Sequence, residues 1–299
     1  MGRTTIEWTD ASWNPIVGCT EISPGCANCY AARLAATRLK YTPQYKGLAT
    51  IDNPPANIGP RWNGEIRFIP ERIEEPKHWK KPRKIFVCDM GDLFHENVAD
   101  EWIEKVLITI HDCPQHTFQV LTKRADRMLA WFQKEWTIYG NFAAPLPNLW
   151  LGVSVENQHF ANERIPLLLH TPAHIHWISA EPLLGPLDMK GLFTLRERST
   201  LHPGWEGLDW VVCGGESGPN ARPLHPDWVR SLRDQCNDSC VPFFFKQWGQ
   251  FLPGTYRDCN GSVVPYFSKV GKKAAGRYID GRTWNQFPDE HLMMKGLEQ

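Results

Sequence analysis

The chain has 299 residues, of which 42% are hydrophobic and 22% charged, so it can bury a core of ordinary size. Its 33 basic and 33 acidic residues give a formal net charge of zero, which disfavours tight nonspecific binding to nucleic acid. No window approaches the roughly 20 consecutive apolar residues of a membrane-spanning helix, and no apolar targeting segment opens the sequence. We therefore expect a cytoplasmic protein that does not contact a membrane.

Alternating strands and helices are predicted along most of the chain. A strand near residues 13–18 and a helix near 27–39 come first. Six short apolar runs follow, each ending in polar residues or glycine, at 85–88, 118–121, 149–153, 175–178, 210–213 and 243–245. Continuous apolar runs of this length are typical of strands buried on both faces of a parallel sheet. Amphipathic stretches between the runs, such as 102–110, 125–133 and 226–232, predict helices.

About seven strand–helix repeats predict an α/β fold, since right-handed βαβ units build parallel sheets. We expect one domain over residues 1–299, a complete or partial (β/α) TIM-type barrel, which typically needs about 250 residues. An open doubly wound sheet is the competing arrangement, and periodicity alone does not separate the two. The proline-rich residues 41–83 are expected to form an irregular insertion with a short strand at 65–69, and about 250–299 an extension.

The strongest chemical signal is a cysteine triplet with the spacing C-x6-C-x2-C, formed by Cys19, Cys26 and Cys29. Pro24 and Gly25 allow a tight turn within it, so the three sulfurs could converge on one point. Thiolates select iron–sulfur clusters, zinc or copper(I). Structural zinc sites usually have four protein ligands, whereas three thiolates on a cubane cluster leave one iron open for catalysis. A catalytic cluster is the favoured interpretation, with zinc and reactive thiols as alternatives.

The other six cysteines are weaker candidates. Cys88, Cys113 and Cys213 lie in or beside apolar runs and are expected to be buried structural thiols. Cys236 and Cys240 form a C-x3-C pair at the end of a predicted helix, which makes a metal site shared with the triplet doubtful.

The triplet in a loop after the first strand of a (β/α) fold resembles the radical S-adenosylmethionine superfamily. Over roughly residues 4–250 the chain more closely resembles a phage- and prophage-associated family with a three-cysteine motif. The segments that carry this resemblance are Trp13-Asn14-Pro15, Met90-Gly91-Asp92-Leu93-Phe94, Gly152-Val153-Ser154-Val155-Glu156-Asn157, Ser179-Ala180-Glu181-Pro182-Leu183 and Gly214-Gly215-Glu216-Ser217-Gly218. The spacing departs from the superfamily's common C-x3-C-x2-C.

The resemblance implies a [4Fe-4S] cluster that binds S-adenosyl-L-methionine at its open iron. It also implies an external one-electron reductant of the flavodoxin or ferredoxin kind. Gly91 and Asp92 resemble the superfamily's Gly-Gly-Glu segment, which receives the ammonium group of S-adenosylmethionine. A glycine turn with a helix-capping aspartate is the plainer interpretation of these two residues.

Further polar residues follow successive strands, where barrel enzymes place their active sites. Ser154, Glu156 and Asn157 are candidates to bind the ribose of the cosubstrate, and Ser179 is a further cofactor-binding candidate. Gly214, Gly215 and Glu216 form a loop that a ligand could approach closely. Glu181 and Lys246 are the candidate catalytic residues, although Lys246 could instead be a rim lysine reaching solvent.

The leading hypothesis is a radical S-adenosylmethionine enzyme that modifies or repairs a nucleic-acid base. DNA or a nucleotide is therefore the expected substrate, and the basic residues Lys269, Lys272, Lys273 and Arg277 permit DNA contact, although a solvated tail explains them equally well. One alternative is a zinc-stabilised nucleic-acid-binding protein without catalysis. Another is an electron-transfer protein, which would need a fourth ligand such as Cys88 or Cys213 beside the triplet.

Overall fold

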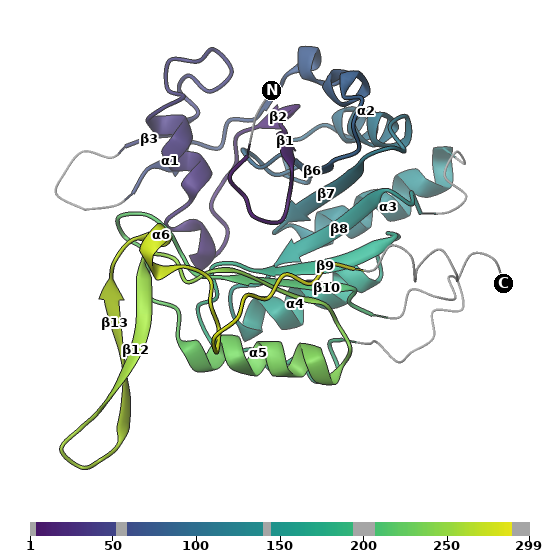
Figure 1. Ribbon diagram of the computed structural model, residues 1–299. Coiled ribbons are helices and arrows are strands. Elements are labelled where there is room, and N and C mark those ends of the chain that lie inside the picture. Colours follow the sequence, from purple (N-terminus) through teal and green to yellow (C-terminus); the bar gives the residue numbers. More distant parts are fainter. Residues whose placement is uncertain (1–3, 52–58, 140–144, 194–206, 289–299) are drawn as a thin grey trace.

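The computed structural model describes residues 4–51, 59–139, 145–193 and 207–288, and a seven-stranded parallel sheet runs through them (Figure 1). Every neighbouring pair in this sheet is parallel. Across the sheet the strands are β1 (Ala11–Trp13), β6 (Lys84–Val87), β7 (Thr117–Thr122), β8 (Leu149–Ser154), β9 (Ile175–Ala180), β10 (Trp210–Gly214) and β11 (Phe243–Gln247). The six apolar runs are thus confirmed as strands of one parallel sheet.

The order of the strands decides between the two predicted architectures. They follow one another across the sheet in sequence order, without the reversal that defines a doubly wound sheet. In the described part of the chain β1 and β11 are the two edges and do not pair with each other. The fold is therefore a mixed α/β structure with a half-barrel sheet, and closure into a complete barrel is not seen in these residues.

Four helices cover one face of the sheet and form the main core with it (Figure 1). They are α2 (Asp100–His111), α3 (Ala125–Tyr139), α4 (Gln158–Leu169) and α5 (Pro226–Asp238). In α2 the buried positions Ile103, Val106, Leu107 and Ile110 recur at helical spacing, which turns one apolar stripe toward the strands. Helix α1 (Tyr30–Ala36) instead packs, through Ala31 and Ala35, in a separate small cluster.

The opposite face of the sheet carries a second, aromatic core. We call it the aromatic floor, and its members are Trp8, Phe86, Trp150, Trp177, Trp210 and Phe244. Five of the six come from alternate positions of their strands, as a period of two requires. Trp177 is central, with ring centroids 5.2 Å from Trp8 and 5.3 Å from Trp210. All four tryptophans of the floor are buried and serve packing.

Residues 41–83 break the strand–helix pattern, as predicted. Their described part holds only two-residue strands and short 3-10 turns. These elements are β3 (Ala49–Thr50), β4 (Arg61–Trp62), β5 (Arg67–Phe68), η2 (Pro70–Arg72) and η3 (Glu75–His78). β3 pairs with β4, and β5 pairs with β2 (Ile16–Val17), so the short strand expected at 65–69 is present.

After β11 the chain forms an antiparallel hairpin that was not predicted. Its strands are β12 (Phe251–Arg257) and β13 (Val263–Lys269), and the hairpin projects away from the half-barrel (Figure 1). The short helix α6 (Lys272–Ala275) follows, and Asn285 then bridges to Phe244 at the edge strand β11. Among the described residues, no helix has the length and apolarity that crossing a membrane requires.

Candidate functional site

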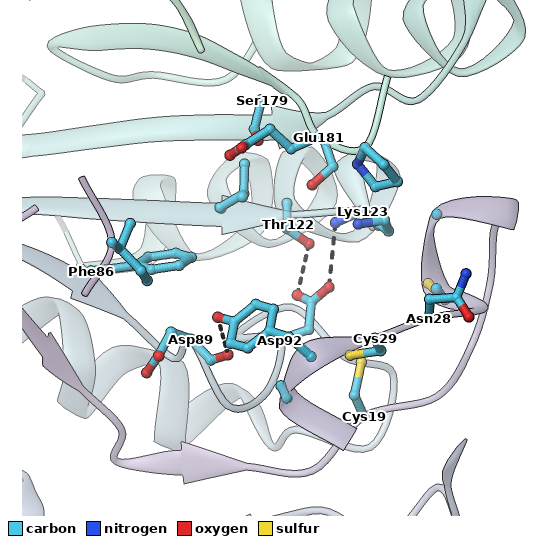
Figure 2. A pocket seen from close by; sticks show the side chains of 18 of the residues that line it. Cys19, Asn28, Cys29, Phe86, Asp89, Asp92, Thr122, Lys123, Ser179 and Glu181 are labelled. Atoms are coloured by element: carbon cyan, nitrogen blue, oxygen red, sulfur yellow. Dashed lines mark hydrogen bonds between the residues drawn. The ribbon is translucent and has the colours of Figure 1, made fainter. Parts of the chain in front are cut away.

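A pocket lies at the carboxyl ends of the parallel strands and gathers residues from nearly all of them (Figure 2). Eleven of the fourteen predicted site residues line it. They are Cys19, Cys26, Cys29, Gly91, Asp92, Ser154, Ser179, Glu181, Gly215, Glu216 and Lys246. Sequence positions more than 200 residues apart therefore meet at one site.

The three cysteines enter the pocket from residues 19–29, which we call the cysteine loop. Cys19 follows Gly18, whose φ of +97° and close approach to the Glu65 carbonyl favour glycine. Cys26 ends the turn η1 (Pro24–Cys26). Cys29 caps α1, its sulfur accepting a hydrogen bond from the Ala32 amide at 3.5 Å. All three are free thiols and partly exposed.

The electrostatics of the pocket favour the protonated thiols of Cys19 and Cys29 in the protein alone. Burial and, to a smaller extent, the Asp92 carboxylate together raise the pKa of Cys19 to about 12, against the opposing effect of Arg124. Burial also raises the pKa of Cys29. Within the described ranges, no group of three or more His, Cys, Asp or Glu side chains is arranged so that it could hold a metal ion. The convergence of the three sulfurs on one cluster therefore stays a prediction.

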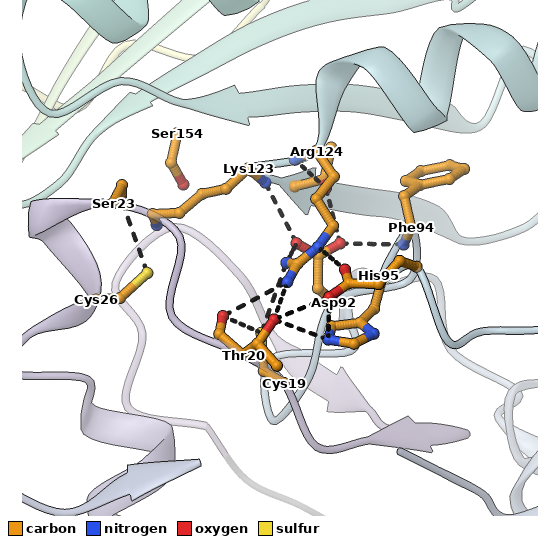
Figure 3. A network of polar contacts seen from close by, with 12 residues as sticks. Cys19, Thr20, Ser23, Cys26, Asp92, Phe94, His95, Lys123, Arg124 and Ser154 are labelled. Atoms are coloured by element: carbon orange, nitrogen blue, oxygen red, sulfur yellow. Dashed lines mark hydrogen bonds and ion pairs between the residues drawn. The ribbon is translucent and has the colours of Figure 1, made fainter. Parts of the chain in front are cut away.

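Arg124 holds the first end of the cysteine loop (Figure 3). Its guanidinium donates to Thr20 Oγ1 at 2.6 Å and lies 3.7 Å from Cys19 Sγ. The same group donates to Asp92 Oδ2 at 3.0 Å, and Thr122 Oγ1 donates to Asp92 Oδ1 at 2.7 Å. Asp92 therefore orients Arg124, a role that its sequence motif did not indicate.

Glu156 holds the middle of the loop from the end of β8. Its carboxylate is fully buried and accepts hydrogen bonds from Ser23 at 2.6 Å and Arg164 at 3.1 Å. Lys123 Nζ lies 3.5 Å away. A Cβ built on Gly25 would come within 2.4 Å of this carboxylate, so the loop and Glu156 fit closely only with glycine there.

Glu216 holds the last part of the loop from the end of β10. Its carboxylate accepts from the Asn28 amide at 2.9 Å and from Arg222 Nη2 at 2.6 Å. Arg222 Nη2 also donates to the Pro24 carbonyl at 3.0 Å. Residues that follow β7, β8 and β10 thus fix the cysteine loop by ionic and hydrogen-bonded contacts.

The wall of the pocket away from the loop carries the two candidate catalytic residues. Lys246 Nζ donates to Glu181 Oε2 at 3.3 Å, and Ser179 Oγ donates to the same oxygen at 3.4 Å. Glu181 and Ser179 point into the pocket across from Asp92 and Cys19 (Figure 2). A Cβ on Gly214 would meet Glu181 Oε1 at 2.3 Å, so glycine at that position makes room for the carboxylate.

Three predicted residues lie outside the pocket lining. Glu156 is buried beneath the cysteine loop, Asn157 caps α4 through the Phe160 amide at 3.3 Å, and Gly214 packs behind Glu181. The sequence analysis did not single out Tyr30 or Phe86, which both line the pocket. For Phe86 a signal existed, because it alternates with Ile85 and Val87 and so faces the opposite side of the sheet.

Fold and pocket together define a half-barrel α/β protein. Four free cysteines line its pocket at the carboxyl ends of the strands, namely the three of the motif and the buried Cys88. The chain belongs to the family described as protein of unknown function (DUF5131), whose model matches residues 3–288. No curated protein and no solved structure matches the chain.

Proposed function

We propose that this protein is a radical S-adenosylmethionine enzyme whose [4Fe-4S] cluster is held by Cys19, Cys26 and Cys29. The observation that carries the proposal is that all three cysteines of the C-x6-C-x2-C motif line one pocket at the carboxyl ends of the strands. We also propose that the protein is related to the phage-associated three-cysteine family that its motifs resemble.

The donor set and its surroundings fit such a cluster chemically. Three thiolates leave one iron for the amino and carboxylate groups of S-adenosylmethionine. Because bound iron favours thiolates, cluster assembly would overcome the raised pKa values of Cys19 and Cys29. Lys123 and Arg124 lie beside the cysteine loop and would offset part of the added negative charge. Assembly would also draw the sulfurs together, since metal binding and local ordering are coupled.

When bound and reduced, the cluster supplies the electron that splits S-adenosylmethionine into methionine and a 5′-deoxyadenosyl radical. The protein's own residues bind and orient. Ser154 and Ser179 offer hydroxyl groups at the strand ends, where they can bind ribose or substrate oxygens. Trp8 and Phe86 line the pocket from the aromatic floor and exclude water from it.

Glu181 and Lys246 are the proposed catalytic pair. They form a largely buried ion pair that presents an acceptor and a donor side by side. Lys246 can hold a proton at Nζ for the substrate, while Glu181 accepts one. The electron comes from an external carrier of the flavodoxin or ferredoxin kind, and the proposed substrate is a base in DNA or in a nucleotide.

Anaerobic reconstitution with iron and sulfide tests the proposal. The protein should become brown, and addition of dithionite and S-adenosylmethionine should release 5′-deoxyadenosine. Cys19→Ala, Cys26→Ala and Cys29→Ala should each abolish the release. Cys240→Ala and Cys259→Ala are matched controls, because these two thiols are exposed and lie outside the pocket lining.

Two outcomes would contradict the proposal. The first is a protein replete with iron and sulfide that releases no 5′-deoxyadenosine. The second is zinc near one atom per chain with no iron, which would support the zinc-stabilised nucleic-acid-binding alternative.

A further inference from the structure

We infer that one face of the β12–β13 hairpin is a binding surface for a single nucleic-acid strand, on which Tyr256 and Tyr266 stack against bases. The inference deepens the proposed function, because it names a polymer strand as the substrate of that pocket. It rests on the proposed function for the chemistry, and on the hairpin itself for the binding.

The register of the hairpin separates its side chains into two faces. Gly254 pairs with Tyr266, Tyr256 with Val264 and Leu252 with Ser268, so these six residues share one face. Phe251, Phe267 and Lys269 belong to the other face.

The face that carries Phe267 is turned toward the body of the protein. Its ring centroid lies 6.2 Å from that of His225, the residue that caps α5. Lys269 Nζ donates to the Pro219 carbonyl at 2.7 Å. The face that carries Tyr256 and Tyr266, which we call the tyrosine face, therefore points outward.

The outward face is unusually apolar and aromatic for a projecting ribbon. Leu252 is 41% exposed, Tyr256 52% and Tyr266 47%, and the two tyrosine ring centroids are 6.4 Å apart. A Cβ built on Gly254 would lie 2.4–2.6 Å from atoms of the Tyr266 side chain, so this ring rests directly on the glycine. The ring is thus supported from beneath and open above, as a base-stacking platform requires.

The charge of this segment favours a nucleic acid as the occupant. Residues 251–278 contain five cationic side chains against one carboxylate, Asp258, in a chain whose formal net charge is zero. The cations are Arg257, Lys269, Lys272, Lys273 and Arg277. Arg257 and Lys269 lie on the face opposite the tyrosines, so the positive charge flanks the tyrosine face and does not lie on it. Lys272 pairs with Glu7 at 2.9 Å, and the segment remains cationic without it. Exposed rings combined with local positive charge are the features that bind single strands without sequence preference.

The hairpin is also continuous with the pocket rim. β12 begins four residues after Gln247, which lines the pocket, and the Gln250 amide donates to the Glu216 carbonyl at 3.1 Å. Lys269 contacts the loop that follows Glu216 through Pro219. A strand stacked on the tyrosine face would therefore run along an element that leads to the pocket, and an unpaired base could enter it.

Fluorescence anisotropy with a labelled oligothymidylate about 16 nucleotides long tests the inference on the full chain. We expect binding at low salt that weakens as salt rises. Tyr256→Ala and Tyr266→Ala should each weaken binding about tenfold. Tyr256→Phe and Tyr266→Phe should bind as tightly as the unaltered protein, because stacking needs only the ring. Tyr41→Ala is the matched control, since Tyr41 is 81% exposed and lies outside the hairpin.

Three results would overturn the inference: no binding at low salt, equal affinity of the double alanine variant and the unaltered protein, or equal affinity for duplex and single strand. Normal oligonucleotide binding by the double alanine variant, together with slower reduction by a flavodoxin, would assign the face to the electron carrier instead. The measurement needs neither cluster nor S-adenosylmethionine. Failure to release 5′-deoxyadenosine would therefore contradict the proposed function and leave the binding of a single strand by the hairpin intact.

Discussion

Ser23 Oγ donates a 2.6 Å hydrogen bond to Glu156 Oε1, and this contact joins the cysteine loop to the end of a strand 133 residues later in the chain. Glu156 is fully buried and is fixed from its other side by Arg164. The loop that carries the three cysteines is thus attached to a rigid part of the sheet. Its position depends on polar contacts, because its own residues bury little apolar surface.

Replacing Ser23 by alanine removes this contact and leaves Glu156 paired with Arg164. Hydrogen bonds to charged groups contribute about 1.5–3 kcal/mol, so we expect the free energy of unfolding to fall by about that amount. We also expect reconstituted protein to lose iron to a chelator faster, because the loop is less constrained. Ser262→Ala, in the turn of the β12–β13 hairpin, is the control. Unchanged rates of iron loss in Ser23→Ala would show that this contact does not position the loop.

Arg124 and Asp92 form a second buried contact at the loop, with both side chains 7% exposed. Arg124→Met would leave the Asp92 carboxylate buried without its cation, at a cost of about 3–5 kcal/mol in the free energy of unfolding. The double variant Arg124→Met with Asp92→Asn removes both charges and should recover part of that loss. Urea unfolding of the two single variants and the double variant measures the coupling. Strictly additive effects would show that the pair is not coupled.

The strands could be predicted from the sequence because buried parallel strands leave a strong local signal. The run 149–153, for example, is apolar at every position and lies within β8. The order of the strands could not be predicted, because periodicity is the same in a barrel and in a doubly wound sheet. Closure was not predictable, because it depends on whether the edge strands β1 and β11 meet, and this is set by the width and curvature of the whole sheet. The hairpin was missed because its strands, Phe251–Arg257 and Val263–Lys269, contain proline and glycine and bury little surface.

The candidate site was predicted well in position and less well in role. Strand ends in a parallel sheet share one edge, so residues such as Ser154, Ser179 and Lys246 could be placed together from sequence alone. Partners could not be predicted, since Glu156 and Glu216 contact loop residues more than 100 positions away. Whether a carboxylate faces a ligand or anchors a loop is decided by such long-range contacts.

The close packing of Gly152 on Trp177 gives a prediction about the aromatic floor. A Cβ on Gly152 would lie 2.5 Å from the indole ring, which is fully buried and cannot move away freely. Gly152→Ala should therefore lower the free energy of unfolding by about 1–3 kcal/mol through overpacking. Gly59→Ala is the control, because its nearest neighbour would be 3.9 Å away. Equal stability of the two variants, measured by urea unfolding, would contradict the packing described.

Two neighbouring groups give the protein opposing dependences of stability on pH. Burial lowers the pKa of His176 from 6.5 to about 4, and burial raises the pKa of Asp209 from 3.8 to about 6. The two residues are in contact, because the His176 amide donates to Asp209 Oδ2 at 2.7 Å. Between about pH 4 and 6.5 the unfolded state binds more protons at His176, so that contribution to stability rises with pH. At Asp209 the folded state binds more protons between about pH 3.8 and 6, so its contribution falls with pH.

Single substitutions should separate these two contributions. His176→Gln keeps a donor for the Thr171 carbonyl, which His176 Nε2 contacts at 2.7 Å, and removes the titration. Relative to the unaltered protein, it should gain up to about 3 kcal/mol in the free energy of unfolding as the pH falls from 6.5 to 4. Asp209→Asn should show the opposite trend and gain relative stability as the pH rises from 3.8 to 6. Urea unfolding at several pH values within these windows measures both differences. A difference that does not vary with pH in either variant would mean that the residue titrates with the same pKa in the folded and unfolded protein.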